Sequence, residues 1–392
     1  MKHLLIQLSV FLILSLFILI PFGYLARVPI NGQVAFFLIE PAFVLLTFFL
    51  FILFKKKQNL LHDRCIQVSA AFIVFSVFSL IMNSWNYVLY STAVGFLYLA
   101  RITPILLFTP VAFSVIKINL IKRRRELMIG VVVSAHLIIL FSLIQYFLYP
   151  ELRNIMYLGW DPHLYRMLGL YFDPPIAGVV YILFALFFYL SGQFKHIYFK
   201  YVLPCIFLLM TLLTYSRITY IAAGVILSFI LLSEKRYRIL AGIAVLFLVV
   251  LFLLPRQFGE GVNLLRTKTI QARVEDYQEG WKVFASNPIF GAGYGRLRYY
   301  REQTTRLRDE GLAESHAGAS FHSSYMTLLA STGVIGLILF TFSLYLLSRK
   351  SKYLTYGVSF LAVAAIGDNV LLHPIPMILL LLLAAVDQLS LS

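Results

Sequence analysis

Charged residues are scarce in this sequence, and acidic residues are the scarcest of them. Only 13% of the 392 residues are charged, and 17 aspartates and glutamates stand against 33 lysines and arginines. Soluble domains carry about 25% charged residues, so this composition excludes an ordinary soluble enzyme. Apolar residues make up 60% of the chain instead. The composition therefore indicates a polytopic membrane protein.

Cysteines and the common catalytic motifs are also rare or missing. The two cysteines, Cys65 and Cys205, fall near predicted cytoplasmic helix ends, so they supply neither a disulfide framework nor a thiolate metal site to the outer loops. The sequence contains no HExxH, Walker loop, DxD pair or serine-nucleophile elbow. Metal, nucleotide and acyl-enzyme chemistry therefore have no support here, and we expect no metal and no cofactor.

Long apolar runs are abundant, and each is near the length that a membrane-spanning helix requires. Such a helix needs about 20 mostly apolar residues, because lipid offers no hydrogen-bond partners to free backbone groups. We predict an all-α polytopic membrane protein with about twelve transmembrane helices. The predicted spans are residues 4–21, 34–54, 65–82, 91–116, 127–148, 175–193, 201–215, 218–233, 239–254, 325–347, 353–371 and 375–389.

The distribution of basic residues predicts the orientation of these spans. Lysine and arginine gather in alternate connections, at 55–57, 122–125, 235–238 and 349–352. Because short cytoplasmic loops are the ones enriched in these residues, we predict that both termini are cytoplasmic. No small-x-small cleavage site follows the first span, which we therefore expect to remain as an anchor. The net charge of +16 then mostly reflects the basic residues of the predicted cytoplasmic loops, and we expect no nucleic-acid partner.

One connection is far longer than the others and is predicted to lie outside the cytoplasm. We divide the chain into nine spans within 1–254, a large extracytoplasmic loop at 255–324, and three spans within 325–392. The loop contains apolar residues at helical spacing, which predict an amphipathic helix: Ile270, Val274, Tyr277, Trp281 and Phe284. The glycine-rich stretch 291–295 follows it, and we interpret it as a plain turn, with a phosphate-binding nest as the alternative.

Two arginines and a histidine are the candidate functional residues. Arg217 lies at the tip of an unusually short hairpin, 201–233, where a cation is unfavourable unless it meets an anion or water. His322 precedes the tenth span, whose amide-rich first turn faces the outer surface, and Arg273 lies in the amphipathic helix. Together they predict an anion site at the outer leaflet. The alternative for His322 is a residue that merely caps its helix.

Three further polar residues allow two interpretations each. Arg101 and Glu40 lie inside predicted spans, where they either pair with each other or line a substrate cavity. Asp173 precedes two prolines at the start of the sixth span. It is therefore either a structural cap or a substrate-binding group.

The order of these motifs resembles one family. A TYSR turn at 214–217 is followed by RVEDYQEGWKVFASNPIFGAGYG at 273–295 and by HSSYMTLLASTGVIG at 322–336. This combination is similar to the O-antigen ligase and polymerase family of bacterial envelope glycosyltransferases, over about residues 165–345. Two features depart from the family pattern: Ser323 follows the histidine where asparagine is common, and MLGLYFDPPIAG at 167–178 replaces a commoner segment. Both departures bear on the identity of the acceptor.

The resemblance implies a fold of the GT-C type and a reaction at the outer face of the bacterial cytoplasmic membrane. A glycan would move from an undecaprenyl-diphosphate carrier to an acceptor, which is a second glycan, lipid A-core or a protein. The family's functional arginines match Arg217 and Arg273, and its histidine matches His322. Arginine forks bind phosphate oxygens, and histidine is a suitable proton acceptor, with Asp173 or Glu275 in reserve.

A polysaccharide-lipid flippase or transporter is the alternative from another class. Many spans, intramembrane charges and basic outer residues would also suit the movement of an anionic lipid. Such transporters commonly contain paired structural repeats, and no internal repeat is visible in this sequence. The long loop on one side also favours the enzyme.

Overall fold

The computed structural model describes residues 2–30, 34–54, 62–83, 89–153, 163–253, 268–304 and 316–390. Each predicted apolar stretch contains a helix: α1 (Lys2–Leu19), α2 (Ile39–Leu53), α3 (Arg64–Met82), α4 (Leu89–Asn119), α5 (Arg124–Leu148), α6 (Pro174–Leu190), α7 (Leu203–Leu212), α8 (Arg217–Ser233), α9 (Tyr237–Leu253), α12 (Ser324–Ser348), α13 (Lys352–Gly367) and α14 (Pro374–Asp387). The predicted cytoplasmic run 55–57 and two parts of the predicted outer loop, 255–267 and 305–315, lie outside the described residues.

Within the described residues, five helical stretches are long and apolar enough to cross a membrane by themselves. They are Lys2–Ala26, Arg64–Met82, Leu89–Phe113, Ile121–Leu148 and Ser324–Ser348. Other apolar helices are shorter, at 10–17 residues, and a helix of 17 residues is about 25 Å long against about 30 Å of hydrocarbon. The chain is thus an all-α integral membrane protein, and the count of twelve spans stays a prediction.

The first two helices are joined by irregular structure that the apolar pattern did not predict. After α1 the chain tightens into a short helical stretch, Ile20–Ala26, in which Gly23 has a positive φ of 48°. Strand β1 (Arg27–Pro29) then pairs antiparallel with β2 (Ala35–Phe37), with Arg27 opposite Phe37. The predicted second span, 34–54, is therefore wrong at its start, because its first apolar residues pair as a strand and α2 begins only at Ile39.

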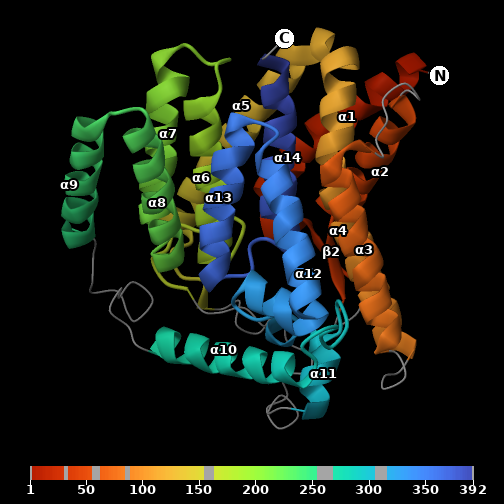
Figure 1. Ribbon diagram of the computed structural model, residues 1–392. Coiled ribbons are helices and arrows are strands. Elements are labelled where there is room, and N and C mark those ends of the chain that lie inside the picture. Colours follow the sequence, from red (N-terminus) through yellow and green to blue (C-terminus); the bar gives the residue numbers. More distant parts are fainter. Residues whose placement is uncertain are drawn as a thin grey trace.

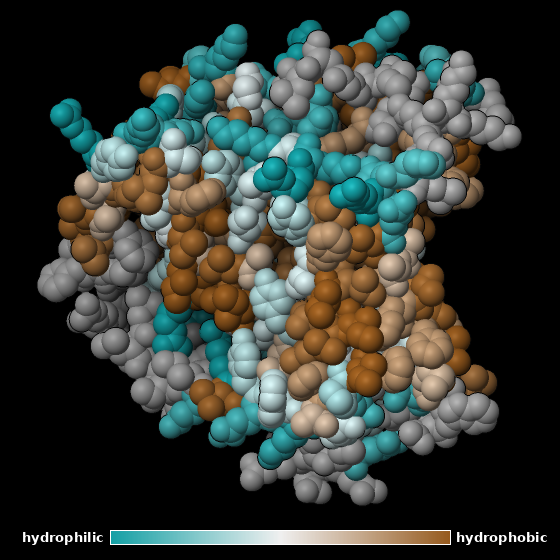
Figure 2. Space-filling model, in the orientation of Figure 1, coloured by the Kyte–Doolittle hydropathy of each residue, from teal (hydrophilic) through white to brown (hydrophobic). Residues whose placement is uncertain are grey.

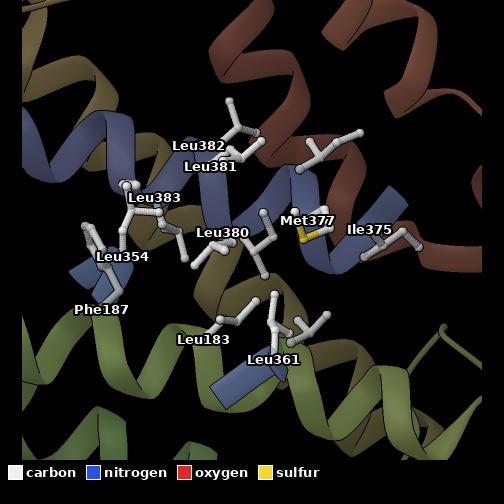
Figure 3. Close-up of a cluster of buried hydrophobic side chains, with 14 of the residues drawn as sticks. Leu183, Phe187, Leu354, Leu361, Ile375, Met377, Leu380, Leu381, Leu382 and Leu383 are labelled. Atoms are coloured by element: carbon white, nitrogen blue, oxygen red, sulfur yellow. The ribbon is translucent and has the colours of Figure 1, made fainter. Parts of the chain in front are cut away.

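Helix α14 forms the centre of the bundle. Its thirteen residues from Pro374 to Val386 are all buried, as expected for a helix that is hydrophobic on every side. Figure 3 shows its leucines surrounded by side chains of neighbouring helices, with Leu380 close to Leu183 of α6. Figure 2 shows the complementary outer surface, where hydrophobic side chains cover the middle of the molecule and hydrophilic ones gather towards its ends.

Two further helices lie at the end of the molecule opposite to both termini (Figure 1). Helix α10 (Lys268–Ser286) runs across the ends of the bundle helices, and α11 (Leu297–Thr304) follows it. The turn between them packs on α12, where the Ala292 amide donates to the carbonyl of Ala330 at 2.8 Å. Helix α12 is kinked at Gly333, whose φ of 67° lets the chain lie directly against the backbone of Ile289. These contacts fix α10 relative to the start of α12.

Candidate functional site

His322 lies immediately before α12, and its neighbour rather than its own side chain caps that helix. The Ser323 hydroxyl accepts a hydrogen bond from the Met326 amide at 3.4 Å and donates one to the carbonyl of Ala365 at 3.0 Å. The capping interpretation of His322 is therefore wrong. The His322 side chain is 54% exposed and turns towards α10.

Asp276 of α10 is the partner of His322. Its Oδ2 lies 3.1 Å from His322 Nδ1 and also accepts a hydrogen bond from the His322 amide at 2.6 Å. The hydrogen bond that His322 donates to Asp276 raises the pKa of His322, an effect that partial burial opposes and that the carboxylate charge reinforces. Because Nδ1 is held by the carboxylate, Nε2 is the ring nitrogen available to a substrate. An imidazole held in this way has the orientation that a general base requires.

A second layer of contacts holds Asp276 in place. Arg301 of α11 binds Glu279 through two hydrogen bonds of 2.8 Å and lies 3.9 Å from Asp276. The Arg301 guanidinium also stacks over the Phe321 ring at 4.8 Å. Asp276 itself is only 11% exposed. Residues of α10 and α11 therefore hold the carboxylate that contacts the His322 ring.

Arg273 lies one turn before Asp276 on the same face of α10. Its Nη2 is 4.0 Å from Asp368 Oδ2, which is too long for a hydrogen bond. Its Nε is buried without a hydrogen-bond partner among the described residues. A buried guanidinium nitrogen of this kind needs an acceptor, and an anionic ligand would provide one.

Arg217 is the first residue of α8 and lies near Arg273. The two guanidinium groups interact electrostatically, and Arg273 and Ile218, the neighbour of Arg217, both contact Gly367 at the end of α13. Figure 2 shows hydrophilic side chains in a recess between the ends of α8 and α13 and the helix α10. Arg217, Arg273 and His322, which are far apart in the sequence, are therefore brought to one region. Their roles in catalysis and binding stay predictions.

The apolar stripe of α10 is exposed at Val274 and Trp281, whereas the side that carries Asp276 and Gly280 is turned towards the bundle. Val274 is 50% exposed and Trp281 57% exposed. Gly280 packs so closely on Met326 of α12 that no side chain fits between the helices. A groove of about 730 Å³ runs along the exposed stripe, from Arg273 past Trp281. The surface of the groove is almost wholly apolar, and Arg273 is among the residues that line it.

Two residues predicted to bind substrate have structural partners. Arg101 Nε forms an ion pair with Glu40 at 2.6 Å, and its Nη2 donates to the carbonyl of Ala35 at 3.0 Å. Asp173 caps α6 by accepting a hydrogen bond from the Ile176 amide at 3.3 Å. The pairing and capping interpretations are thus confirmed, and substrate binding by either residue stays a prediction.

The glycine-rich stretch 291–295 is a packing turn. The amides of Gly291 and Gly293 donate to the carbonyls of Asn287 and Ser331, at 2.8 and 2.9 Å. Since these amides are already bonded to backbone carbonyls, the phosphate-nest alternative is wrong at these positions. Gly291, Gly293 and Gly295 all have positive φ, which explains why the turn needs them.

Asp276 is the residue of the candidate site that sequence reasoning missed. The sequence placed it on the polar side of an amphipathic helix and gave no reason to choose it over Glu275 or Glu279. Its spacing of three residues from Arg273 was the available signal, because residues three apart share a helix face. Within the described residues, no group of three His, Cys, Asp or Glu side chains is placed to hold a metal ion.

A family model described as O-antigen ligase matches residues 201–341, a segment that contains Arg217, Arg273, Asp276 and His322. No curated protein matches the chain. The resemblance to the O-antigen ligase and polymerase family is confirmed by this match. At the level of the family, it supports a membrane glycosyltransferase.

Proposed function

We propose that the protein transfers a glycan from an undecaprenyl-diphosphate carrier to an acceptor hydroxyl at the outer face of the bacterial cytoplasmic membrane. The proposed reaction needs no metal ion and inverts the anomeric carbon. The termini face the cytoplasm in this proposal, and α10 and α11 face outwards. The acceptor is a second carrier-linked glycan in a polymerase, and lipid A-core or a protein in a ligase.

The observation that carries the proposal is the convergence of a positioned histidine with two arginines. His322 is held by Asp276 at 3.1 Å, and Arg273, one turn away on α10, interacts with Arg217 of α8. A glycosyl diphosphate leaves with at least two negative charges, so it needs cations and a separate proton acceptor for the attacking hydroxyl. In this proposal Arg217 and Arg273 are the cations and His322 is the proton acceptor.

The following steps use these groups. Arg217 and Arg273 bind the diphosphate and stabilise the charge that develops on its leaving oxygen. His322 Nε2 takes the proton of the acceptor hydroxyl while that oxygen forms a bond to the anomeric carbon and the carbon–oxygen bond to the diphosphate breaks. Asp276 stabilises the resulting imidazolium, and His322 then returns its proton to water.

The groove beside Arg273 suits the lipid part of the same donor. A polyprenyl diphosphate joins a doubly charged group to a long apolar chain, and the groove places apolar side chains of α10 next to a guanidinium. Val274 and Trp281 line it, and burying their exposed surface against an apolar chain is favourable.

Reconstitution into liposomes tests the proposal. The purified protein would receive a carrier-linked glycan from its own host in the presence of EDTA, and product size would be followed on a gel. We expect a covalent glycan product that is lost in Arg217→Ala, Arg273→Ala and His322→Ala. A ladder of lengthening lipid-linked chains indicates a polymerase, and a single shift that requires lipid A-core or protein indicates a ligase.

Arg236→Ala is the matched control, because Arg236 is an exposed arginine just beyond the other end of α8. It should retain near-normal turnover. Normal turnover in Arg217→Ala and Arg273→Ala, in membranes that contain folded protein, would refute the assigned roles. Movement of the lipid between leaflets without any covalent product would favour the flippase.

A further inference from the structure

A group of aromatic rings has no part in the proposed mechanism. It consists of Tyr24, Phe37, Phe172 and His373, which we call the aromatic patch. The Tyr24 and Phe172 rings are inclined by only 23° at 6.4 Å between their centres, and Tyr24 meets Phe37 edge-on at 5.1 Å. The His373 ring lies 5.5 Å from Phe37. Phe37 is buried, whereas the other three residues remain half-buried.

Contacts outside the rings hold Tyr24 and Phe172 beside each other. The Tyr24 amide donates a hydrogen bond to the carbonyl of Leu170 at 2.8 Å. The Tyr171 hydroxyl donates one to the carbonyl of Ile20 at 3.1 Å. The break after α1 and the segment before α6 are therefore fastened together, and the positions of the two rings do not depend on their own contact alone.

Phe172 has a backbone conformation that a bulky residue rarely adopts. Its φ is 51°, which lies in the left-handed region and costs about 1–3 kcal/mol for a residue of this kind. Strain of this size persists where the surrounding structure enforces it, and it gathers at sites of function. Here it accompanies a ring that stays half-buried beside Tyr24 instead of entering the core.

The histidine of the patch is neutral. The Ile375 amide donates to His373 Nδ1 at 3.3 Å, so the proton of the ring is on Nε2, which donates to the Tyr24 hydroxyl oxygen at 3.1 Å. Burial, together with the positive charges of Arg101 and Arg27, lowers the pKa of His373 to about 3. The patch therefore offers flat rings and hydrogen-bonding edges, which suit an uncharged polar ring better than an ion.

One short loop connects the aromatic patch to the candidate site. Asp368, whose Oδ2 is 4.0 Å from Arg273 Nη2, stands five residues before His373, so their Cα atoms are at most about 18 Å apart. Ser324, the first residue of α12, fixes this loop. Its hydroxyl accepts a hydrogen bond from the Leu371 amide at 3.0 Å and donates one to the carbonyl of Asp368 at 3.4 Å. A short oligosaccharide could therefore span the distance from the candidate site to the patch.

A polar atom of the same loop lacks a partner. Asn369 Oδ1 is buried and accepts no hydrogen bond from the part of the chain that the structure describes. A buried acceptor without a donor is unfavourable. The hydroxyl groups of a sugar are donors of the kind that this amide oxygen needs.

A sugar ring combines the features that this place would recognise. One face of a pyranose is lined by C–H groups and is apolar, whereas its hydroxyls lie around the edge. The apolar face would cover the Tyr24 and Phe172 rings, and the edge would meet polar groups such as Asn369.

We propose that the aromatic patch is a subsite for a neutral sugar ring of the glycan, several sugars away from the bond that reacts. This inference rests on the proposed function and adds that the enzyme recognises the glycan at a distance from the reaction. The sugar belongs either to the glycan of the donor or to a glycan acceptor. Only a glycan long enough to reach the patch gains binding energy there.

Kinetic measurements with glycans of two lengths test the inference. Phe172→Leu keeps an apolar side chain but removes the flat ring. We expect this change to raise the KM for a full-length glycan at least fivefold, and the KM for a single carrier-linked sugar less than twofold. Donor and acceptor would be shortened in turn, and the substrate whose KM responds is the one that occupies the patch.

Two controls separate stacking from folding. Phe172→Tyr retains a flat ring and should recover most of the affinity that Phe172→Leu loses. Phe342→Leu removes a ring from another stacked pair, with Tyr345 of α12 at 6.2 Å, and should leave both KM values unchanged. Equal increases for long and short glycans, or no increase for either, would overturn the inference.

Direct binding keeps the test independent of turnover. Free oligosaccharides released from the glycan of the host would be titrated into His322→Ala protein in nanodiscs. We expect binding that Phe172→Leu weakens at least fivefold, and either no binding or unchanged binding would overturn the inference. If the oligosaccharide binds through Phe172 but the unaltered protein forms no covalent product, the proposed function fails and the sugar subsite stands. Product formation that is insensitive to Phe172 would refute the subsite and leave the proposed function in place.

Discussion

Replacement of Asp276 by asparagine is the sharpest test of the proposed base. Asparagine preserves the shape of the side chain but removes the charge that holds a proton on His322. A hydrogen bond to a charged group contributes about 1.5–3 kcal/mol when it is protected from water, and an exposed ion pair about 0.2–1 kcal/mol. Asp276 is 11% exposed and His322 54%, so we take about 1 kcal/mol for their interaction.

The sign of the effect follows from the direction of the shift. Asp276 raises the pKa of His322, and a base works only above its pKa, so the activity of the unaltered protein is lost as the pH falls through that raised value. In Asp276→Asn the acidic limb of the pH profile should move to lower pH, because the carboxylate no longer raises the pKa of His322. The plateau should fall about fivefold, since about 1 kcal/mol of stabilisation of the imidazolium is lost.

The assay is kcat/KM against pH in liposomes, with Glu275→Gln as the matched control. Glu275 is the adjacent carboxylate on an exposed side of α10, so its removal should leave both the limb and the plateau in place. An unchanged profile in Asp276→Asn, or the same shift in both variants, would refute the assignment of Asp276 as the partner of the base.

Three further outcomes are expected. Gly333→Ala should lower the unfolding temperature sharply, because the added Cβ would lie 2.2 Å from a backbone carbonyl oxygen and φ is 67°. Gly242→Ala is the control: nothing lies within 4 Å of its added Cβ, so the change should be neutral or stabilise the fold by up to about 1 kcal/mol. Glu40→Gln should lower the free energy of unfolding by about 3 kcal/mol, because it leaves the half-buried Arg101 without a counter-charge. In a double-mutant cycle, changing both Glu40 and Arg101 should cost less than the sum of the two single changes. Trp281, with the other two tryptophans replaced by phenylalanine, should be quenched by brominated lipid because it is 57% exposed on the apolar stripe; the absence of quenching would contradict lipid contact there.

The helices were predictable because apolar length is a strong and local signal. Every predicted apolar stretch contains a helix, although the second begins at Ile39 rather than residue 34. The error has a physical cause, since Ala35–Phe37 are apolar enough for a span but gain their hydrogen bonds from Arg27–Pro29. Pairing between strands depends on the turn and on the partner, which a count of apolar residues does not register.

The charged and titratable residues of the candidate site could be predicted from the sequence, but the contacts between them could not. Arg217, Arg273 and His322 were conspicuous because charged and titratable groups are rare in such a chain. The partner of His322 depended on which face of α10 turns inwards, and the apolar stripe suggested the opposite face. Gly280 determines which face of α10 turns inwards, since only a residue without a side chain permits the contact with Met326.

In the proposed mechanism the base is divided between two elements, so the lipid bilayer would contribute to the position of its catalytic groups. His322 precedes α12, whereas Asp276 belongs to α10, whose exposed stripe, with Val274 at 50%, is suited to rest on lipid. If α10 rests on lipid, loss of that support would separate Asp276 from His322. Transfer from a bilayer to a loose detergent micelle should therefore slow the reaction even when every transmembrane helix stays folded, and comparison of turnover in nanodiscs and in detergent would measure how much of the rate the membrane itself contributes.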